Sequence, residues 1–424
     1  MSNLRKAVTG LCGLLAALAI VAVAVWQLNT YGESLTEPTD LPALATSTPA
    51  RGAYLAQVGN CAGCHTVPGG QPYAGGLGID TPFGAVYASN LTPDAAAGIG
   101  SWSRADFWRA MHHGQSKGGR LLYPAFPYTS YTLVTRDDSD ALFAYLMSLP
   151  ASSQANKPHT VRFPYNTQTA LAAWRALYFK PAVYADSATS SAEWNRGAYL
   201  VNGLGHCSAC HAARNALGAT DGPNLAGGLI PLQNWYAPSL VSMQEASVAN
   251  WRLEDITALF KTGVSSAASV NGPMAEVVFG STQHWTDADL KAMAVYLKAL
   301  PVKETVTQSA KPSATPSGSK LYEQHCAQCH GDDGQGVANA YPALAGNRAV
   351  LMPQTANLVQ MVLNGGYAPA TAGNPRPFGM PPFVLVLNDG DVAEVLTHIR
   401  SSWGNQAGNV SALDVMRIRS NGQY

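Results

Sequence analysis

Apolar residues follow one pattern at the start of the chain and a different pattern in the rest of it. Residues 7–26 form twenty consecutive positions without a charged side chain, preceded by the basic Arg5 and Lys6. Farther along, apolar residues recur in short segments with the spacing of one helix face, and loops rich in glycine and proline separate these segments. The pattern therefore predicts an all-α protein behind a strongly apolar first segment.

The first segment, residues 1–33, has the features of an export signal. A cleavable signal peptide carries an apolar stretch of about 7–15 residues, whereas about 20 apolar residues can span a bilayer as a helix. The length favours an uncleaved transmembrane anchor, while the sequence Ala22-Val23-Ala24 keeps cleavage open as the alternative. In both cases the basic residues stay inside, so the rest of the chain is expected on the outer, oxidising side of the membrane.

Repeated segments predict a pair of helices at the ends of each of three domains. Residues 51–55 and 196–200 both read Arg-Gly-Ala-Tyr-Leu, and residues 318–322 are a looser third copy. Thr135, Thr286 and Asn388 each precede acidic residues and an apolar helical segment, which is the pattern of a helix N-cap. We expect domains at residues 40–150, 190–302 and 315–405, which agrees with about three domains for 424 residues.

Two linkers join these domains. Residues 151–190 include a predicted helix at 169–179, whose Leu171, Trp174, Leu177 and Tyr178 make one apolar face that is expected to pack on the rest of the protein. Residues 303–319 mix Lys, Thr, Ser and Pro and have the composition of a flexible tether.

Composition narrows the possible partners. Lys plus Arg is 26 and Asp plus Glu is 26, so no excess of positive charge is available to neutralise a nucleic acid. Charged residues are 12% of the chain, against about 25% in a typical soluble domain. The low charge suggests that a membrane or a partner covers part of the surface.

The candidate chemistry lies in six of the seven cysteines. They form three C-x-x-C-H motifs, at Cys61, Cys64 and His65, at Cys207, Cys210 and His211, and at Cys326, Cys329 and His330. This is the attachment signature of a c-type haem, since on a helix both thiols and the following imidazole share one face. Disulfides, a redox pair and a zinc site are alternatives, but none of them requires the histidine three times. The motifs therefore predict three covalently bound haem c groups, with the three histidines as iron ligands.

The opposite iron ligand of an electron-carrying c haem is usually a methionine on a loop before the last helix. Met274 and Met380 stand in such loops in the second and third domains, with Met243 and Met352 as fallback ligands.

In the first domain Phe126 stands where the methionine is expected, and phenylalanine cannot bind iron. Two alternatives stay open for haem 1. Its iron is five-coordinate, or its sixth ligand is one of four residues on predicted helices, namely Met111, His112, His113 and Met147. A haem without the methionine is expected to have a lower reduction potential than the other two.

From about residue 45 to 405 the chain resembles the three-haem cytochrome c subunits of membrane-bound bacterial dehydrogenases. The resemblance is carried by the C-x-x-C-H motifs, the two Arg-Gly-Ala-Tyr-Leu segments, and the sequences at 90–94, 98–102 and 271–277. It implies three tandem class I cytochrome c domains on the periplasmic side of the bacterial inner membrane. It also implies that electrons come from a separate catalytic subunit and pass to ubiquinone.

Residues 123–128, Tyr-Pro-Ala-Phe-Pro-Tyr, bear on the partner. In the resembling family, a methionine in this loop goes with quinoprotein or flavoprotein alcohol, sorbitol or gluconate dehydrogenases. The phenylalanine form goes with molybdopterin and iron–sulfur subunits that oxidise aldehydes or N-heterocycles. The resemblance therefore favours an aldehyde dehydrogenase partner with a small iron–sulfur subunit, and the first branch is the alternative.

Two other functions compete with that of an electron-transfer subunit. A haem 1 with an open site, and His112 or His113 as a distal acid or base, would be a peroxidase-type enzyme. A free-standing carrier would dock transiently with several oxidases or reductases. Apart from the haem motifs, we find no catalytic motif in the sequence, so no independent catalytic site is expected.

Overall fold

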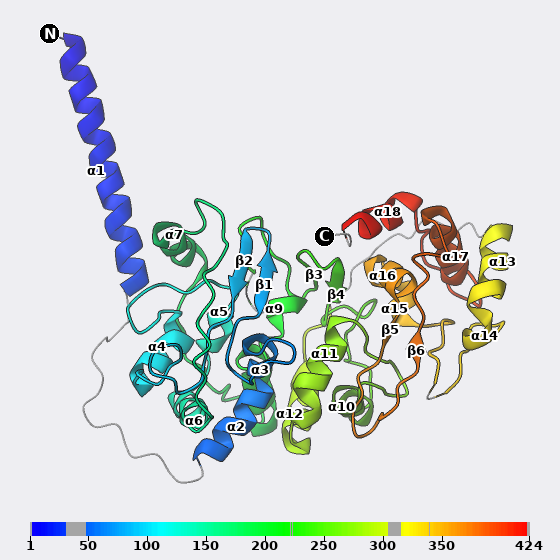
Figure 1. The fold of residues 1–424 in the computed structure, drawn as a ribbon. Helices are drawn as coiled ribbons and strands as arrows, with labels where there is room; N and C mark the ends of the chain where they lie inside the picture. Colours follow the sequence, from blue (N-terminus) through cyan, green and yellow to red (C-terminus); the bar gives the residue numbers. More distant parts are fainter. Residues whose placement is uncertain are drawn as a thin grey trace. The chain divides into compact units, whose positions relative to one another are not determined.

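The structure is a computed structural model that describes residues 2–30, 48–220, 222, 224–303, 315–338 and 340–421 (Figure 1). The chain divides into two compact units, Met1–Ala53 with His65–Tyr184, and Tyr54–Cys64 with Ala185–Tyr424. The predicted start of the first domain at residues 40–47 and most of the predicted tether at 303–319 lie outside the described residues.

Helices make up most of the ordered elements, which agrees with the all-α expectation. In chain order the helices are α1 (Ser2–Thr30), α2 (Thr48–Val58), α3 (Cys61–His65), α4 (Arg104–His113), α5 (Tyr128–Tyr131), α6 (Arg136–Met147), α7 (Gln168–Tyr178), α8 (Ala192–Asn202), α9 (Ser208–His211), α10 (Leu253–Thr262), α11 (Pro273–Gly280), the 3₁₀-helix η1 (Thr282–His284), α12 (Asp287–Lys298), α13 (Pro316–His325), α14 (Ala327–His330), α15 (Arg348–Leu351), α16 (Ala356–Asn364), α17 (Asp389–Ser401) and α18 (Ala412–Asn421).

Three short antiparallel hairpins complete the fold. They are formed by β1 (Gly78–Thr81) with β2 (Gly84–Tyr87), β3 (Gly228–Ile230) with β4 (Trp235–Ala237), and β5 (Gly366–Tyr367) with β6 (Gly379–Met380). Each hairpin lies between a C-x-x-C-H motif and the last long helix of its repeat, α6, α12 or α17.

The same helix crossing occurs three times. Helices α2, α8 and α13 lead into the cysteine motifs, and they cross α6, α12 and α17 respectively. A glycine lies at each crossing, where an added Cβ would overlap a backbone carbonyl oxygen: Gly52 against Ala141, Gly197 against Ala292, and Gly318 against Glu394. The glycines of the three repeated segments therefore allow two helix backbones to approach more closely than any other residue would permit.

The predicted N-caps are confirmed. Thr135, Thr286 and Asn388 each accept a hydrogen bond from a backbone amide in the first turn of the following helix. In the first two repeats the same helices also bind the arginine that precedes the crossing glycine. Arg51 pairs with Asp138, and Arg196 pairs with Asp289.

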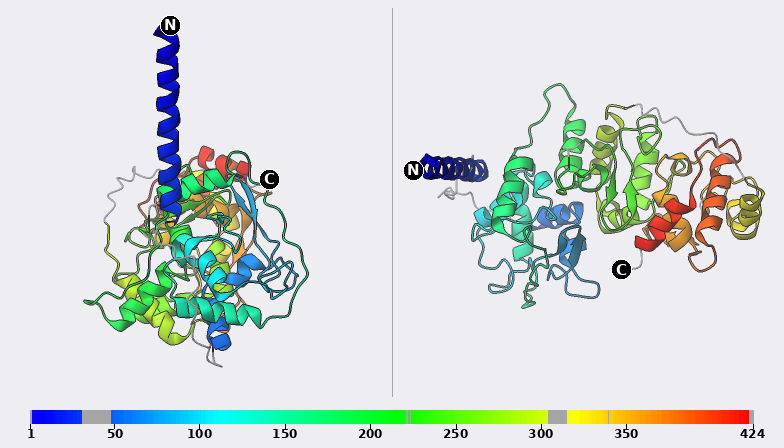
Figure 2. Two further views of the ribbon diagram at one scale, coloured as in Figure 1. Left: turned by 90° about the vertical axis from the view of Figure 1, so that its left-hand side faces the viewer. Right: turned by 90° about the horizontal axis from the view of Figure 1, so that it is seen from above.

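Helix α7 confirms the helix predicted in the first linker, although its apolar face is only partly covered. Leu171 is buried, whereas Leu177 is 69% exposed. At the same helix, Arg175 donates to the side chain of Asn29 at the end of α1, and Asn29 donates to Ala172 O. These contacts join α1 to α7, and the end of α1 lies beside α7 in Figures 1 and 2.

Within the described parts of the chain, the structure contains no helix that combines the length and the apolar character needed to cross a membrane. The anchor expected at residues 7–26 stays a prediction.

Helix α18 lies beyond residue 405, where the third domain was expected to end. Its Val415 is fully buried in one core with Val392 and Leu396 of α17, and Tyr322 of α13 belongs to the same core. Thr397 of α17 accepts a hydrogen bond from the backbone amide of Val410. The third repeat therefore includes residues up to α18.

The glycine crossing predicts a specific mutational effect. We expect Gly52→Ala to destabilise the first unit by about 2–3 kcal/mol, because the new methyl group forces α2 away from α6. Gly118→Ala, at a position with nothing within 4 Å of an added Cβ, is the matched control. Thermal unfolding followed by circular dichroism measures both variants. Equal melting temperatures for the two variants would contradict a close crossing.

Candidate functional site

The cysteines of the three motifs lie on or at the start of short helical turns, α3, α9 and α14. None of the six is joined to another cysteine in a disulfide. Burial raises the pKa of Cys61 and Cys207 to about 12, and that of Cys326 to about 11. Redox-active C-x-x-C pairs need the opposite, a lowered thiol pKa that favours the thiolate. The environment of the motifs therefore argues against the redox-pair interpretation.

The histidine of each motif makes the same hydrogen bond. Its Nδ1 lies at bonding distance from a backbone carbonyl oxygen: His65 from Ser89 O at 2.7 Å, His211 from Pro238 O at 2.7 Å, and His330 from Pro342 O at 2.9 Å. Because a carbonyl oxygen only accepts, Nδ1 must carry the proton. The Nε2 lone pair is then available for a metal, which is how metal-binding histidines are usually oriented.

The charge state of these histidines fits the same role. Burial lowers the pKa of His65, His211 and His330 below the ordinary value of 6.5, although the hydrogen bond to the carbonyl acts in the opposite direction. The imidazoles are therefore neutral at pH 7, and the neutral ring is the form that binds iron.

In the second repeat, an aromatic side chain joins the histidine's carbonyl partner to the predicted methionine loop. Trp235 lies three residues before Pro238, and its ring packs on Gly272, where an added Cβ would lie 2.8 Å from the ring. Gly272 has a φ of 56° and precedes Pro273, the first residue of α11. Met274 follows directly. Met274 is therefore the second residue of α11 and does not lie in the loop that the sequence predicts. The segment behind His211 and the start of α11 lie against each other.

The third repeat is built in the same way. The rings of Tyr341, next to Pro342, and of Phe378, two residues before Met380, have their centroids 5.3 Å apart. Met380 itself pairs with Gly366 in the β5–β6 hairpin, and it packs against the buried core of the third repeat.

The first repeat makes this link through a histidine. Tyr87 lies two residues before Ser89, and its backbone amide donates to His159 Nδ1 at 3.1 Å. The His159 ring meets the ring of Tyr123 edge to face, with centroids 5.0 Å apart. Tyr123 lies three residues before Phe126. The loop of Phe126 is thus joined to the carbonyl-bearing segment as the methionine loops are, but it presents a side chain that cannot bind iron.

The other candidate ligands of haem 1 lie on α4 and α6. His112 is 6% exposed, and its ring stacks on Trp108 with centroids 4.3 Å apart. Burial lowers the pKa of His112 and of His113 to about 4, so both are neutral at pH 7. Met111 is buried as well, whereas Met147 is half-buried at the end of α6. The fallback Met352 of the third repeat belongs to the buried residues, and Met243 is half-buried.

The structure places the cysteines of the first two motifs in one compact unit, whereas His65 belongs to the other unit. Tyr54 donates to Asp289 Oδ2 at 2.6 Å, and Arg196 binds both oxygens of the same carboxylate at 2.8 and 2.7 Å. Burial, followed by the bond to Asp289, raises the pKa of Tyr54. Burial also raises the pKa of Cys64, with a further contribution from nearby Cys210. Cys64 of the first motif and Cys210 of the second are therefore close enough for their charges to interact.

Sequence reasoning did not identify the carbonyl acceptors Ser89, Pro238 and Pro342, because a backbone carbonyl leaves no mark on residue type. A partial signal exists in two of the three repeats, where the acceptor is a proline preceded within three residues by an aromatic side chain.

The residues of the motifs fit a c-type haem. Two thiols on one helical turn can form thioethers to a porphyrin edge, and the following imidazole has its Nε2 free for iron. When bound, haem supplies a one-electron redox centre.

Comparison with known proteins agrees with this chemistry. The Cytochrome c family model matches residues 49–150 and 316–403. The cytochrome c subunit of a quinone alcohol dehydrogenase from Gluconacetobacter polyoxogenes is 38% identical over 394 residues, covering 88% of this chain and 84% of that protein. The gluconate 2-dehydrogenase cytochrome c subunit of Pantoea cypripedii is 38% identical over 397 residues, covering 87% of this chain and 89% of the relative.

One subunit of the nicotinate dehydrogenase of Pseudomonas putida is 40% identical over 364 residues, covering 82% of this chain but 30% of that protein. The match along most of the chain and the haem-binding geometry lead to one conclusion. This chain belongs to the family of cytochrome c subunits of bacterial dehydrogenases, and it carries covalently bound haem c.

Proposed function

We propose that this chain is the electron-transfer subunit of a membrane-bound dehydrogenase complex, and that it passes electrons from a separate catalytic subunit to ubiquinone. The observation that carries the proposal is the hydrogen bond from His Nδ1 to a backbone carbonyl, made in the same way by all three motifs. It prepares three equivalent imidazoles for iron. Electron transfer through several centres in one chain needs such a repeated site.

The proposal assigns three haems to three class I domains, at residues 40–150, 190–302 and 315–405, with α18 packed onto the core of the third domain. Thioethers would form at Cys61 and Cys64, at Cys207 and Cys210, and at Cys326 and Cys329. His65, His211 and His330 would bind iron on one side, and Met274 and Met380 on the other side of haems 2 and 3. The contacts of Trp235 with Gly272 and of Tyr341 with Phe378 support the two methionine assignments.

The first two haems are proposed to exchange electrons directly. Support comes from the proximity of Cys64 and Cys210, and from the shared binding of Tyr54 and Arg196 to Asp289. These contacts would hold the two attachment helices at a fixed separation. A fixed short separation favours fast electron hopping, since no rearrangement precedes each step.

The catalytic partner is proposed to be a quinone-linked alcohol or sugar-acid dehydrogenase. This changes the expectation of an aldehyde dehydrogenase with an iron–sulfur subunit, because the relatives named above include alcohol and gluconate dehydrogenases and no aldehyde dehydrogenase. A second candidate is an enzyme that oxidises N-heterocycles. The nicotinate dehydrogenase relative favours it, and so does Phe126 in the first loop.

The proposed location is the periplasmic side of the bacterial inner membrane. The basic Arg5 and Lys6 before the uncharged residues 7–26 support it. The proposal keeps residues 1–33 as anchor or signal.

The partner assignment predicts the composition of the native complex. After detergent extraction through a tag on this chain, we expect a large dehydrogenase subunit in a one-to-one ratio, identified by mass spectrometry. Addition of an alcohol or sugar acid should then reduce the haems within the complex. Recovery of a molybdopterin hydroxylase would favour the second candidate, and recovery of this chain alone at low detergent would contradict a permanent subunit.

The position of Phe126 predicts that a methionine there will change the reduction potential of haem 1. We expect Phe126→Met to add a sixth ligand to haem 1 and to raise its midpoint potential by on the order of 100 mV. A spectroelectrochemical titration compares wild type with Phe126→Met, and Phe126→Leu is the control, because leucine has a similar size and no sulfur. Three unchanged midpoints in Phe126→Met would show that this loop does not face haem 1.

A further inference from the structure

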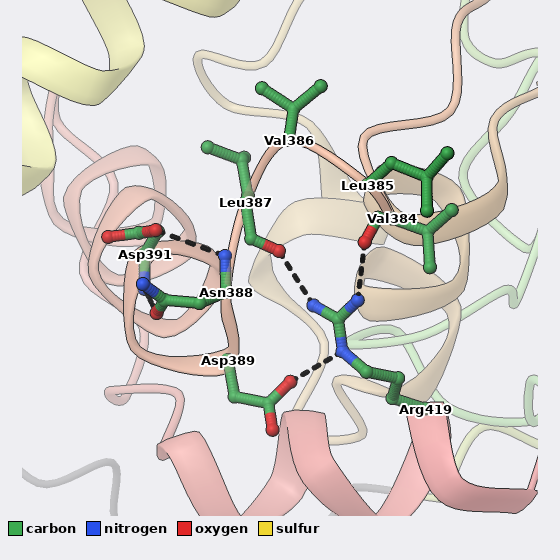
Figure 3. Close-up of a pocket in the computed structure, with 8 residues that line it drawn as sticks. All are labelled: Val384, Leu385, Val386, Leu387, Asn388, Asp389, Asp391 and Arg419. Atoms are coloured by element: carbon green, nitrogen blue, oxygen red, sulfur yellow. Dashed lines mark hydrogen bonds and ion pairs between the residues drawn. The ribbon is translucent and has the colours of Figure 1, made fainter.

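Arg419 of α18 fastens the segment that follows Met380. Its guanidinium makes three hydrogen bonds, from Nη1 to Val384 O at 2.7 Å, from Nη2 to Leu387 O at 2.8 Å, and from Nε to Asp389 Oδ1 at 2.6 Å (Figure 3). These three residues lie between Met380 and the first turn of α17. One side chain thus holds both the middle and the end of the segment.

Lys261 of α10 makes the corresponding contacts in the second repeat. Its Nζ donates to Trp285 O at 2.8 Å and lies 3.5 Å from Asp287 Oδ1. Trp285 precedes the N-cap Thr286 as Leu387 precedes the N-cap Asn388, and Asp287 and Asp389 are both the first residues of their helices. The two basic side chains come from unrelated helices but bind the same pair of groups.

The position of these cations is electrostatically unusual. A positive charge near a helix N-terminus is disfavoured by the helix dipole, and the carboxylates of Asp287 and Asp389 offset that cost. Lys261 and Arg419 each donate a hydrogen bond to the carbonyl oxygen of a buried residue, since Trp285 is 2% exposed and Leu387 is 4% exposed. A buried carbonyl without a partner is destabilising, and a bond from a charged donor is stronger than a neutral one.

The first repeat, which has no methionine in its loop, differs at this point. His112 lies two residues before Gly114, the left-handed residue that ends α4, as Lys261 lies two residues before Gly263 at the end of α10. A basic side chain thus bonds the carbonyl before the N-cap in the two repeats that offer a methionine, whereas the repeat that offers Phe126 has His112 at the position that corresponds to Lys261.

We propose that Arg419 and Lys261 are positioning residues that hold the ends of the segments following Met380 and Met274, and so keep both methionines within bonding distance of iron. The inference rests on the proposed methionine ligation. The iron–thioether bond is weak enough to be exchanged, so it persists only while the loop stays in place. Hydrogen bonds from Phe383 N to Val362 O and from Val384 N to Leu363 O, both 3.0 Å, fasten the other side of the third loop to α16.

Displacement of methionine by imidazole tests the proposal in the full-length ferric protein. Imidazole nitrogen replaces the methionine sulfur on iron without any change of oxidation state, and the red charge-transfer band of the iron–thioether bond disappears. Titrations of wild type should show one phase for each methionine-bound haem. In Met380→Ala one phase should be absent, which assigns that phase to haem 3.

We expect Arg419→Gln to tighten apparent imidazole binding at haem 3 by about tenfold, because one charged hydrogen-bond donor is lost. Lys261→Met should shift only the phase of haem 2, by a similar or smaller factor. Arg417→Gln, on the exposed side of α18, is the matched control and should shift neither phase. If Arg419→Gln does not accumulate, Arg419→Lys keeps the charge, loses the forked contact, and should give a smaller shift of the same phase.

The outcomes distinguish a failure of the proposed methionine ligation from a failure of the positioning role of Arg419 and Lys261. A wild-type spectrum without any iron–thioether band would refute the methionine ligation of the proposed function. A normal band with imidazole binding unchanged in Arg419→Gln and in Lys261→Met would refute the positioning role and leave the ligation intact. Equal shifts of both phases in either variant would indicate general loosening of the fold and would also overturn the inference.

Discussion

The hydrogen bond from His Nδ1 to a backbone carbonyl is the interaction on which the functional architecture depends. It settles which nitrogen carries the proton, and it fixes the direction of the ring before any iron is present. Burial keeps each ring neutral. Because the acceptor is backbone, the orientation of the histidine is tied to the path of the chain at Ser89, Pro238 and Pro342. The three sites can therefore diverge in their surrounding side chains without losing this orientation.

The rest of the fold brings the segment that carries Phe126, Met274 or Met380 against the segment that carries the carbonyl acceptor of the histidine. The crossing glycines bring each motif-bearing helix close to the last helix of its repeat, and the N-capped last helix defines where the distal loop ends. Aromatic contacts then join the loop to the carbonyl-bearing segment. In the proposed ligation, the difference between Phe126 and the two methionines would change the chemistry of one haem within the same framework of helices.

Sequence reasoning predicted the features that depend on local side-chain chemistry. The N-caps at Thr135, Thr286 and Asn388 could be read from residue type, because a short polar side chain before acidic residues satisfies free amides. The motif histidines followed from their position after the second cysteine. The carbonyl acceptors could not be predicted, since any residue supplies a carbonyl. The role of α18 was missed because its contacts with residues 384–389 join segments about 30 positions apart, and the closeness of Cys64 to Cys210 depends on packing over a still longer separation.

The central claim is that three haems are joined covalently to this chain, each through its own cysteine pair. The mass of the intact protein, purified from a host that matures c-type cytochromes, tests it most directly. The account predicts the polypeptide mass plus three haems, and the loss of one haem mass when Cys326 and Cys329 are both replaced by alanine. A wild-type mass with fewer than three haems, or a double variant that keeps all three, would contradict it.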